Sequence, residues 1–305
     1  MSQSADAFAR GGGDHVALGI RGLSKRFARF ELGPIDFVVP RGYVVGLVGA
    51  NGSGKTTTIK SLLGMVVPDA GGLAVPPMDR VGVVLDTPYF MNNWDPFAIE
   101  KAVRPFYPRW SGERYRALLL RFGVPADAKL KEMSRGTGMK LQFAVALAHD
   151  PEVLVLDEPT SGLDPLARDE FIDLLADFMQ DESRAVLFST HITADLQRIA
   201  DYVTVLDSGR VAASAPTSDL IDSYRVVRGG TRDLTEAMRA AIYGLRVHSA
   251  GFEGLALTSS AAAWPGRLVL EAPTLDQIVV GVAKHGRSGQ AAARAGAVVT
   301  SEGAS

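Results

Sequence analysis

The sequence predicts an α/β fold built around a parallel β-sheet, and three features support this expectation. Short apolar runs typical of strands alternate with segments whose apolar residues recur every three or four positions. The run Val153–Leu156 is apolar throughout, as in a strand buried on both faces of a parallel sheet. A glycine-rich loop at 49–55 joins a strand-like run to a helix-like segment.

Length and composition narrow the possible classes of protein. The chain has 305 residues, enough for one large domain or for a large domain with a small one. Its formal net charge of −2 gives no support to nucleic-acid binding as the main activity. It contains no cysteine, which excludes disulfides and thiol-based metal sites. No apolar run approaches the roughly 20 residues that span a bilayer, and the start lacks the apolar core of a signal peptide.

Apolar and β-branched runs between turn residues predict strands, and a period of three to four predicts helices. The expected strands are Val16–Ile20, Ile35–Val39, Tyr43–Val48, Val81–Leu85, Val153–Leu156, Ala185–Phe188, Val203–Leu206 and Arg210–Ala213. The last two flank Asp207-Ser208-Gly209, which is typical of a hairpin turn. The expected helices are Thr56–Leu63, a segment around Tyr115–Phe122, Pro165–Gln180 and Ala194–Ala200.

The same patterns divide the chain into segments. Residues 1–15 and 287–305 are small, polar and glycine-rich, so we expect a disordered leader and a disordered tail. The main domain is expected over 16–224, with a helical insert at about 95–149. Residues 225–286 are expected to form a small separate α/β unit.

The segment from Gly49 to Thr56 matches the phosphate-loop pattern G-x-x-x-x-G-K-[ST]. Glycines let successive backbone N–H groups point into one concavity, and the following helix adds the positive end of its dipole. Lys55 is expected to reach the β- and γ-phosphates of ATP, while the Thr56 hydroxyl binds Mg²⁺. The ATP-binding residues predicted along this loop are Gly49, Ala50, Asn51, Gly52, Ser53, Gly54, Lys55, Thr56 and Thr57.

Two carboxylates follow the buried run Val153–Leu156. Ligands of open α/β sheets bind at the carboxyl ends of the strands. We therefore expect Asp157 to hold Mg²⁺, through water, and Glu158 to act as the general base that polarises the attacking water. The alternative is a pair of solvated acids in a surface turn, which is less compatible with a phosphate loop that needs a second Mg²⁺ ligand.

Three further segments follow the same order along the chain: Ser134-Arg135-Gly136, Ser161–Asp164 and His191. Together with the motifs above, they resemble the ATP-binding domain of ABC transporters over about Ile20–Tyr224. The resemblance implies a P-loop NTPase fold of the ABC ATPase type, with a helical insert that carries the signature motif. It implies that Lys55, Glu158 and His191 carry ATP hydrolysis, with His191 contacting the γ-phosphate.

The resemblance also assigns roles across a dimer. Ser134, Arg135 and Gly136 form the signature that acts on the nucleotide of the opposite protomer, and the helix Gly138–Ala148 points toward that phosphate. Asp164 lies in the loop that crosses the dimer interface. Independently of the family, Ser134 has the residue type of a helix N-cap. Phe27 occupies the position of the aromatic residue that stacks on adenine, with a core phenylalanine as the equal alternative.

Two departures from the family pattern stand out. The usual Ser-Gly-Gly-Gln signature is replaced by Ser134-Arg135-Gly136-Thr137-Gly138, and arginine at the second position is familiar from bacterial exporters. The family's glutamine after the third strand, a Mg²⁺ ligand, corresponds here to Asp86. We predict that Asp86 also lies in the Mg²⁺ shell; the alternative is that it caps the turn before Pro88.

The loop after Asp86 is rich in aromatic residues and methionine. Such residues are enriched in the buried centres of interfaces. In ABC transporters this region forms the groove that receives a short helix of the membrane subunit. The candidate docking residues are Tyr89, Phe90, Met91, Trp94 and Phe97, and at least half of them are expected to be core instead.

The resemblance therefore implies an ATP hydrolase that drives transmembrane transport, with export the expected direction. The implied partners are a second ATP-binding subunit, in a homodimer or heterodimer, and integral membrane permease subunits; nucleic acid is not expected. The implied location is cytoplasmic, peripheral on the inner face of the membrane. The alternative is a soluble ABC ATPase with a regulatory or non-transport role, but the chain has one cassette and no sustained heptads. A non-hydrolysing module is disfavoured because Lys55, Asp157, Glu158 and His191 are all present.

Overall fold

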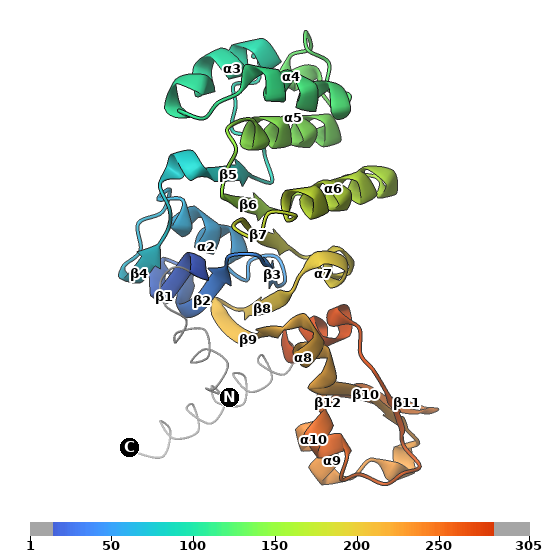
Figure 1. Cartoon of the computed structure of the whole chain (residues 1–305). Coiled ribbons are helices and arrows are strands. Elements are labelled where there is room, and N and C mark those ends of the chain that lie inside the picture. The colour runs from blue at the N-terminus through green and yellow to red at the C-terminus, as the bar shows by residue number, and fades with distance from the viewer. Residues whose placement is uncertain (1–14, 284–305) are drawn as a thin grey trace. The chain divides into compact units, whose positions relative to one another are not determined.

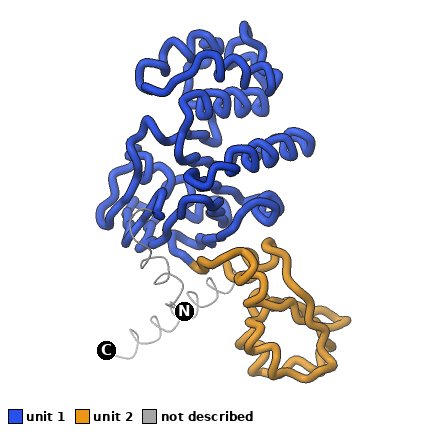
Figure 2. Tube along the Cα trace, in the orientation of Figure 1, with its two compact units in different colours: residues 1–211 blue, residues 212–305 orange. Residues whose placement is uncertain are grey.

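The computed structural model describes residues 15–283, which form two compact units. One unit extends to Val211 and the other begins at Ala212 (Figure 2). The boundary expected from the sequence lies thirteen residues later, after residue 224. The leader predicted over 1–15 lies outside the described residues except for His15, and the predicted tail at 287–305 lies outside them entirely.

The first unit is organised around a six-stranded sheet of order β5-β6-β7-β3-β8-β9. Neighbours from β5 to β8 pair in parallel, which confirms the predicted fold class. Strand β6 is buried at every position, as its apolar run predicts. The strands are β3 (Val44–Val48), β5 (Val81–Val84), β6 (Val153–Asp157), β7 (Ala185–Thr190), β8 (Tyr202–Asp207) and β9 (Arg210–Pro216).

The turn between β8 and β9 uses two residues in the left-handed region. Ser208 has φ 49° and Gly209 has φ 81°. A two-residue type I′ hairpin turn requires positive φ at both positions, and glycine supplies it without strain. The predicted turn therefore lies where the sequence indicates it.

A smaller antiparallel sheet has the order β2-β1-β4. One apolar core joins this sheet, the central sheet and α2, with Ile35, Leu47 and Ile59 among its fully buried members. The strands of the smaller sheet are β1 (Val16–Phe27), β2 (Phe30–Pro40) and β4 (Ala70–Ala74), and the helices around the central sheet are α2 (Lys55–Leu62), α6 (Pro165–Phe178) and α7 (Thr193–Ile199).

The predicted helical insert consists of three α-helices with a core of their own, which gather at the top of the view in Figure 1. Their first turns are capped by the side chains of Asp95, Ser111 and Ser134. The helices are α3 (Pro96–Val103), α4 (Gly112–Arg121) and α5 (Arg135–Ala148), with single 3₁₀ turns at Arg104–Phe106 and Leu130–Glu132. Helix α5 thus begins at Arg135, three residues before the expected Gly138.

The second unit holds a four-stranded antiparallel sheet of order β11-β12-β10-β13. Its β-α-β-β-α-β chain order gives the ferredoxin-like, split β-α-β arrangement. Val227, Phe252 and Ala256 lie in its buried core. The elements are α8 (Thr217–Asp222), β10 (Tyr224–Gly229), η5 (Thr231–Asp233), α9 (Glu236–Ala241), β11 (Tyr243–His248), β12 (Gly251–Leu257), α10 (Thr258–Ala261), β13 (Val269–Glu271) and a last helical segment at 275–283.

Candidate functional site

The predicted phosphate loop runs from the end of β3 into the start of α2, and its glycines are structurally required. Gly52 and Gly54 have φ of 80° and 112°, and Gly54 is the N-cap of α2. A Cβ atom on Gly49 would lie 2.2 Å from the carbonyl oxygen of Leu206. The loop can therefore curl tightly at the N-terminus of α2, where the helix dipole favours an anion.

Lys55 is almost completely buried at this helix start, with 5% of its surface exposed. Its Nζ atom donates a hydrogen bond to the carbonyl oxygen of Gly49 at 2.8 Å and lies 3.3 Å from Oε1 of Glu158. A buried ammonium group needs such partners, because desolvation without compensation is costly. Lys55 is thus held at the loop, facing the end of β6.

Asp157 is the last residue of β6 and is 1% exposed. Its Oδ1 atom accepts a hydrogen bond of 2.5 Å from the Ser189 hydroxyl on β7. Burial raises the pKa of the Asp157 carboxyl above its ordinary value, while hydrogen bonds from Ser189 and Thr56 oppose this rise. The contact with Thr56 brings together the two side chains that the sequence assigns to Mg²⁺.

Glu158 follows with φ 51°, a left-handed conformation that is uncommon for a non-glycine residue. Its backbone N–H donates to the carbonyl oxygen of Ser189 at 2.9 Å. Its Oε2 atom lies 2.7 Å from Nδ1 of His191 and accepts from the His191 backbone N–H at 3.2 Å. The turn after β6 therefore directs the Glu158 carboxylate between Lys55 and His191.

Lys55, Glu158 and His191 open onto one cavity of about 630 Å³, which Asp157 does not line. That volume lies within the range of small-molecule sites. The cavity joins the phosphate loop, the ends of β5 and β6 and the loop after β7. Its lining residues are Phe30, Asn51, Gly52, Gly54, Lys55, Thr56, Thr57, Asp86, Arg135, Glu158, Ser161 and His191.

The aromatic residue that lines the cavity is Phe30 and not the predicted Phe27. The Phe30 ring lies above Gly54, where an added Cβ would approach its Cζ atom to 3.3 Å. Phe27 lies beside it, with a centroid separation of 6.3 Å, and is 41% exposed. Sequence reasoning missed Phe30, although both aromatics flank the β1–β2 turn and were equally visible.

The signature and dimer-loop residues have mainly capping contacts within the chain. The Ser134 hydroxyl accepts from Thr137 N–H at 3.1 Å, and Asp164 Oδ1 accepts from Ala167 N–H at 2.9 Å. Gly136 passes close to Leu163, which a Cβ atom would approach to 3.3 Å. Ser134, Gly136 and Asp164 do not line the cavity, whereas Arg135 does.

Asp86 lies at the cavity with its carboxylate ion-paired to the Arg135 guanidinium. Its predicted partner, Mg²⁺, would therefore have to compete with Arg135. Thr56 and Asp157 fit the ion better, because their oxygens already lie together and Mg²⁺ takes its remaining ligands from phosphates and water. Within residues 15–283, no group of three or more His, Cys, Asp or Glu side chains is placed to hold a metal.

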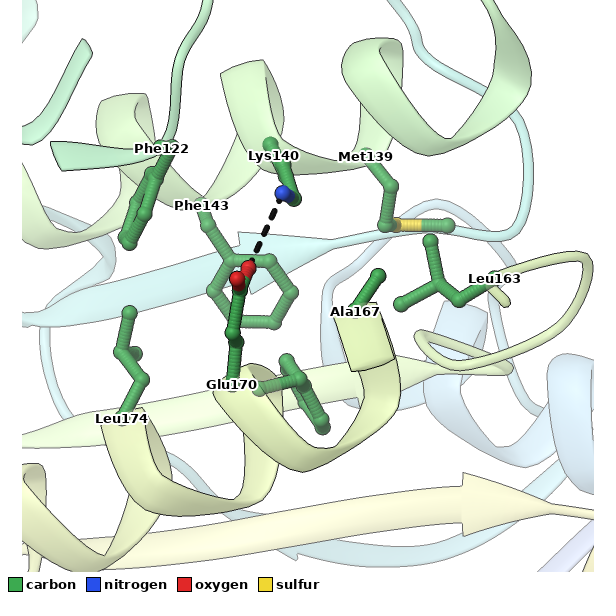
Figure 3. Close-up of a pocket in the computed structure, with 9 residues that line it drawn as sticks. Phe122, Met139, Lys140, Phe143, Leu163, Ala167, Glu170 and Leu174 are labelled. Carbon is green, nitrogen blue, oxygen red and sulfur yellow. Dashed lines mark hydrogen bonds and ion pairs between the residues drawn. The ribbon is translucent and has the colours of Figure 1, made fainter. Parts of the chain in front are cut away.

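A second, apolar cleft lies between α5 and α6 (Figure 3). Its volume of about 20 Å³ has room for little more than one water molecule. Phe143 and Phe171 pack in it with ring centroids 4.6 Å apart, and Lys140 Nζ bridges to Glu170 Oε2 at 3.1 Å. This cleft is a packing seam between the helices and cannot hold a nucleotide.

The predicted docking loop divides into exposed and buried side chains. Tyr89, Met91 and Phe97 are exposed, with Met91 61% accessible. Phe90 is buried and Trp94 packs against the core of the helical insert. Among residues 15–283, no helix is both long and apolar enough to cross a membrane.

Comparisons with known proteins identify relatives that match about two thirds of the chain or more. A family model described as "ABC transporter" matches residues 32–161. "Nod factor export ATP-binding protein I" of Burkholderia lata is 39% identical over 223 residues, covering 67% of this chain and 72% of that protein. The protein of that name from Rhizobium sp. is 32% identical over 258 residues, covering 76% and 83%. A solved structure described as "Structure of ATP binding subunit of ABC transporter" has a TM-score of 0.60 at 26% identity, covering 67% of this chain and 91% of that chain.

Proposed function

The chain belongs to the ATP-binding subunits of ABC transporters, and we propose that it powers export as one half of a nucleotide-sandwich dimer. Subunits of this family bind and hydrolyse ATP and work with membrane permease components. The observation that carries the proposal is the convergence of Lys55, Glu158 and His191 on one cavity.

In this proposal the triphosphate of ATP lies along the loop from Gly49 to Thr57. The backbone N–H groups at the start of α2 face the phosphate oxygens, and the helix dipole adds favourable charge. Lys55 exchanges its contact with the Gly49 carbonyl for the β- and γ-phosphates. Because Lys55 is already buried and oriented, little side-chain entropy is lost on binding.

Hydrolysis then requires a base at the γ-phosphate, and Glu158 is the carboxylate placed for it. A water oxygen forms the new bond to phosphorus while the bond to the β–γ bridging oxygen breaks, giving ADP and phosphate. The Glu158 carboxylate accepts the proton of the water. His191 keeps the carboxylate oriented through its 2.7 Å contact and faces the same cavity.

Mg²⁺ is proposed to accompany ATP, held by the Thr56 hydroxyl and by Asp157. The ion would neutralise charge on the phosphate oxygens when bound. Asp157 is suited to this role because it is buried at the strand end and already contacts Thr56.

The proposed partners are a second ATP-binding subunit and integral membrane permeases. Two exposed side chains of the docking loop, Tyr89 and Met91, are proposed to contact the permease. The chain would then lie on the cytoplasmic face of the membrane through that contact. Ser134 and Gly136 would complete the nucleotide site of the partner subunit.

Export is favoured by the arginine in the signature and by the relatives named for Nod factor export. The test uses inside-out membrane vesicles that carry the assembled complex, with the nucleotide site facing the outer solution. Added ATP is expected to drive labelled compounds into the vesicles, and the Lys55→Ala complex is expected not to. Uptake only into right-side-out vesicles loaded with ATP would contradict export.

A further inference from the structure

Arg135 joins three separate segments at the edge of the nucleotide cavity. It is the first residue of α5, and its Nη2 atom pairs with Oδ1 of Asp86, just beyond β5. The same Nη2 atom donates to the Ser161 hydroxyl at 3.2 Å. Both charged side chains are about half exposed, so the pair lies at the open side of the cavity, where an entering ligand can reach it.

The loop after Ser161 is shaped to leave room for the arginine. Gly162 has φ 78°, and a Cβ atom there would lie 3.0 Å from Cδ of Arg135. The aliphatic stem of Arg135 therefore packs directly on a position that only glycine occupies without strain. This contact limits the directions in which the guanidinium can point.

A second contact on the same helix fixes the strand end to which Arg135 is paired. Gln142, two helical turns after Arg135, is fully buried. Its side chain accepts from Leu85 N–H at 3.2 Å and donates to the Leu85 carbonyl at 2.9 Å. Helix α5 thus binds two consecutive residues, Leu85 and Asp86, so Arg135 and Asp86 are held in register with each other.

Part of the hydrogen-bonding capacity of Arg135 is unused. A guanidinium has five N–H donors, and the contacts of Arg135 with Asp86 and Ser161 both use Nη2. In the described part of the chain, Nε and Nη1 have no hydrogen-bond partner. Arginine binds phosphate oxygens through two parallel N–H groups, and the cavity that Arg135 lines also contains Lys55 and Thr56.

We propose that Arg135 binds the terminal phosphate of the nucleotide held by its own chain, and that Asp86 positions it there. This inference rests on the proposed ATP site but differs from the signature role, in which Arg135 would serve the opposite protomer. It also relates the two departures of the sequence to each other. A carboxylate at position 86 would repel a phosphate, and the guanidinium of Arg135 neutralises it.

The first test measures nucleotide affinity in a single chain. Calorimetry with a non-hydrolysable ATP analogue is carried out at protein concentrations where sedimentation shows a monomer. Arg135→Ala is expected to weaken binding of the analogue about tenfold or more and to leave the affinity for AMP unchanged. Arg135→Lys should recover part of the loss. Equal analogue affinity in Arg135→Ala and wild type would overturn the proposal.

A matched control removes another ion pair of α5. Glu170→Gln breaks the bridge to Lys140, which lies in the apolar cleft and not at the nucleotide cavity. It should leave the affinity for the ATP analogue unchanged. A loss equal to that of Arg135→Ala would show that any disturbance of α5 weakens binding, and this too would overturn the proposal.

The role of Asp86 is tested by a double-mutant cycle. If Asp86 acts through Arg135, Asp86→Asn weakens binding in the wild-type background but causes no further loss in Arg135→Ala, where removal of the unpaired carboxylate should restore part of the affinity. The Mg²⁺ concentration at half-maximal binding should then be the same in Arg135→Ala with and without Asp86→Asn. A further loss in the double variant, with a higher Mg²⁺ requirement, would assign Asp86 to the metal and overturn its positioning role.

Mixed dimers separate action within one chain from action on the partner. Lys55→Ala chains are mixed with Ser134→Ala chains or with Arg135→Ala chains, and ATP hydrolysis is measured. The Ser134→Ala mixture should regain activity, because one of its two sites is intact if Ser134 acts across the dimer. The Arg135→Ala mixture should not, because the only chain with Lys55 lacks its own Arg135. Recovery of ATP hydrolysis in the Arg135→Ala mixture would overturn the proposal. If neither mixture regains hydrolysis, this would count against the proposed dimer. The single-chain affinities then decide the role of Arg135.

Discussion

The Nδ1 atom of His191 and the Oε2 atom of Glu158 lie 2.7 Å apart at the nucleotide cavity. Glu158 is only 8% exposed, and its backbone is held in the left-handed region by the turn after β6. Its Oε1 atom also lies 3.3 Å from Lys55 Nζ, and its Oε2 atom accepts from the His191 backbone N–H at 3.2 Å. The His191 ring makes the shortest of these contacts, so it helps to position Glu158, the proposed general base.

Replacing His191 by alanine is expected to impair turnover more than binding. Without the imidazole, the Glu158 carboxylate loses its shortest contact, and misplacement of a catalytic group by about 1 Å can cost on the order of 100-fold in rate. We expect kcat to fall by about that factor while ATP affinity changes little. Stopped-flow binding and phosphate release on the same variant measure the two quantities, and an equal loss in both would contradict a positioning role.

Replacing Lys55 by alanine is expected to abolish tight ATP binding. Its Nζ atom is buried, and a charged hydrogen bond is worth roughly 1.5–3 kcal/mol, or about 10- to 150-fold in affinity. Lys60, in the last turn of α2, is the control, because it does not line the cavity and Lys60→Ala should bind ATP normally. Hydrolysis at the wild-type rate by Lys55→Ala would refute the site.

His149 is expected to make the first unit less stable in acid. The ring is 1% exposed, stacks on Tyr107 at 4.1 Å, and burial lowers its pKa to about 4. The unfolded chain, with an ordinary pKa near 6.5, binds the proton more readily. The contribution of neutral His149 to the free energy of unfolding should therefore be fully present above pH 6.5. It should fall as the pH drops toward 4, by up to about 1.4 kcal/mol per pH unit.

Urea denaturation at pH 7.5, 6 and 5 measures this dependence. Replacing Trp264 by phenylalanine leaves Trp94 and Trp110 as the fluorescent tryptophans of the first unit. In that background His149→Phe should make the free energy of unfolding less dependent on pH. His248→Asn, at an exposed position, should leave that dependence unchanged. An identical slope in His149→Phe and its parent would show that other groups cause the acid sensitivity.

The docking loop should separate into two classes of variant. Tyr89→Ala and Met91→Ala remove exposed side chains, so they should preserve thermal stability and ATP hydrolysis but weaken assembly with the permease. Phe90→Ala and Trp94→Ala remove core contacts, and Phe90→Ala should cost about 3–5 kcal/mol. Thermal denaturation and co-purification distinguish them, and normal assembly of both exposed variants would place the permease contact elsewhere.

Much of the fold could be predicted because the central strands have strong local signals. The runs that became β3, β6 and β7 are mostly apolar, and every residue of these three strands is buried. Strand β4 was missed because Ala70–Ala74 is small, glycine-rich and exposed at every position. It is a strand only through its pairing with β1, about fifty positions earlier in the chain.

The site shows the same division between local and long-range information. The predicted phosphate loop and the two acids at the end of β6 could be read from short motifs. The pairing of Asp86 with Arg135 could not, since it joins residues 49 positions apart through the packing of α5 on β5. The choice between Phe27 and Phe30 likewise depends on which ring the β1–β2 turn brings above Gly54.

If this chain pairs with a second copy around ATP, and the pair opens on hydrolysis, the mass of Glu158→Gln in solution will show it. Without the general base, turnover should fall about 100-fold or more, and ATP should remain trapped between two chains. Light scattering with ATP and Mg²⁺ is expected to give twice the mass of one chain, and with ADP the mass of one. Glu158→Gln that binds ATP yet keeps the mass of a single chain would exclude pairing between two copies of this chain.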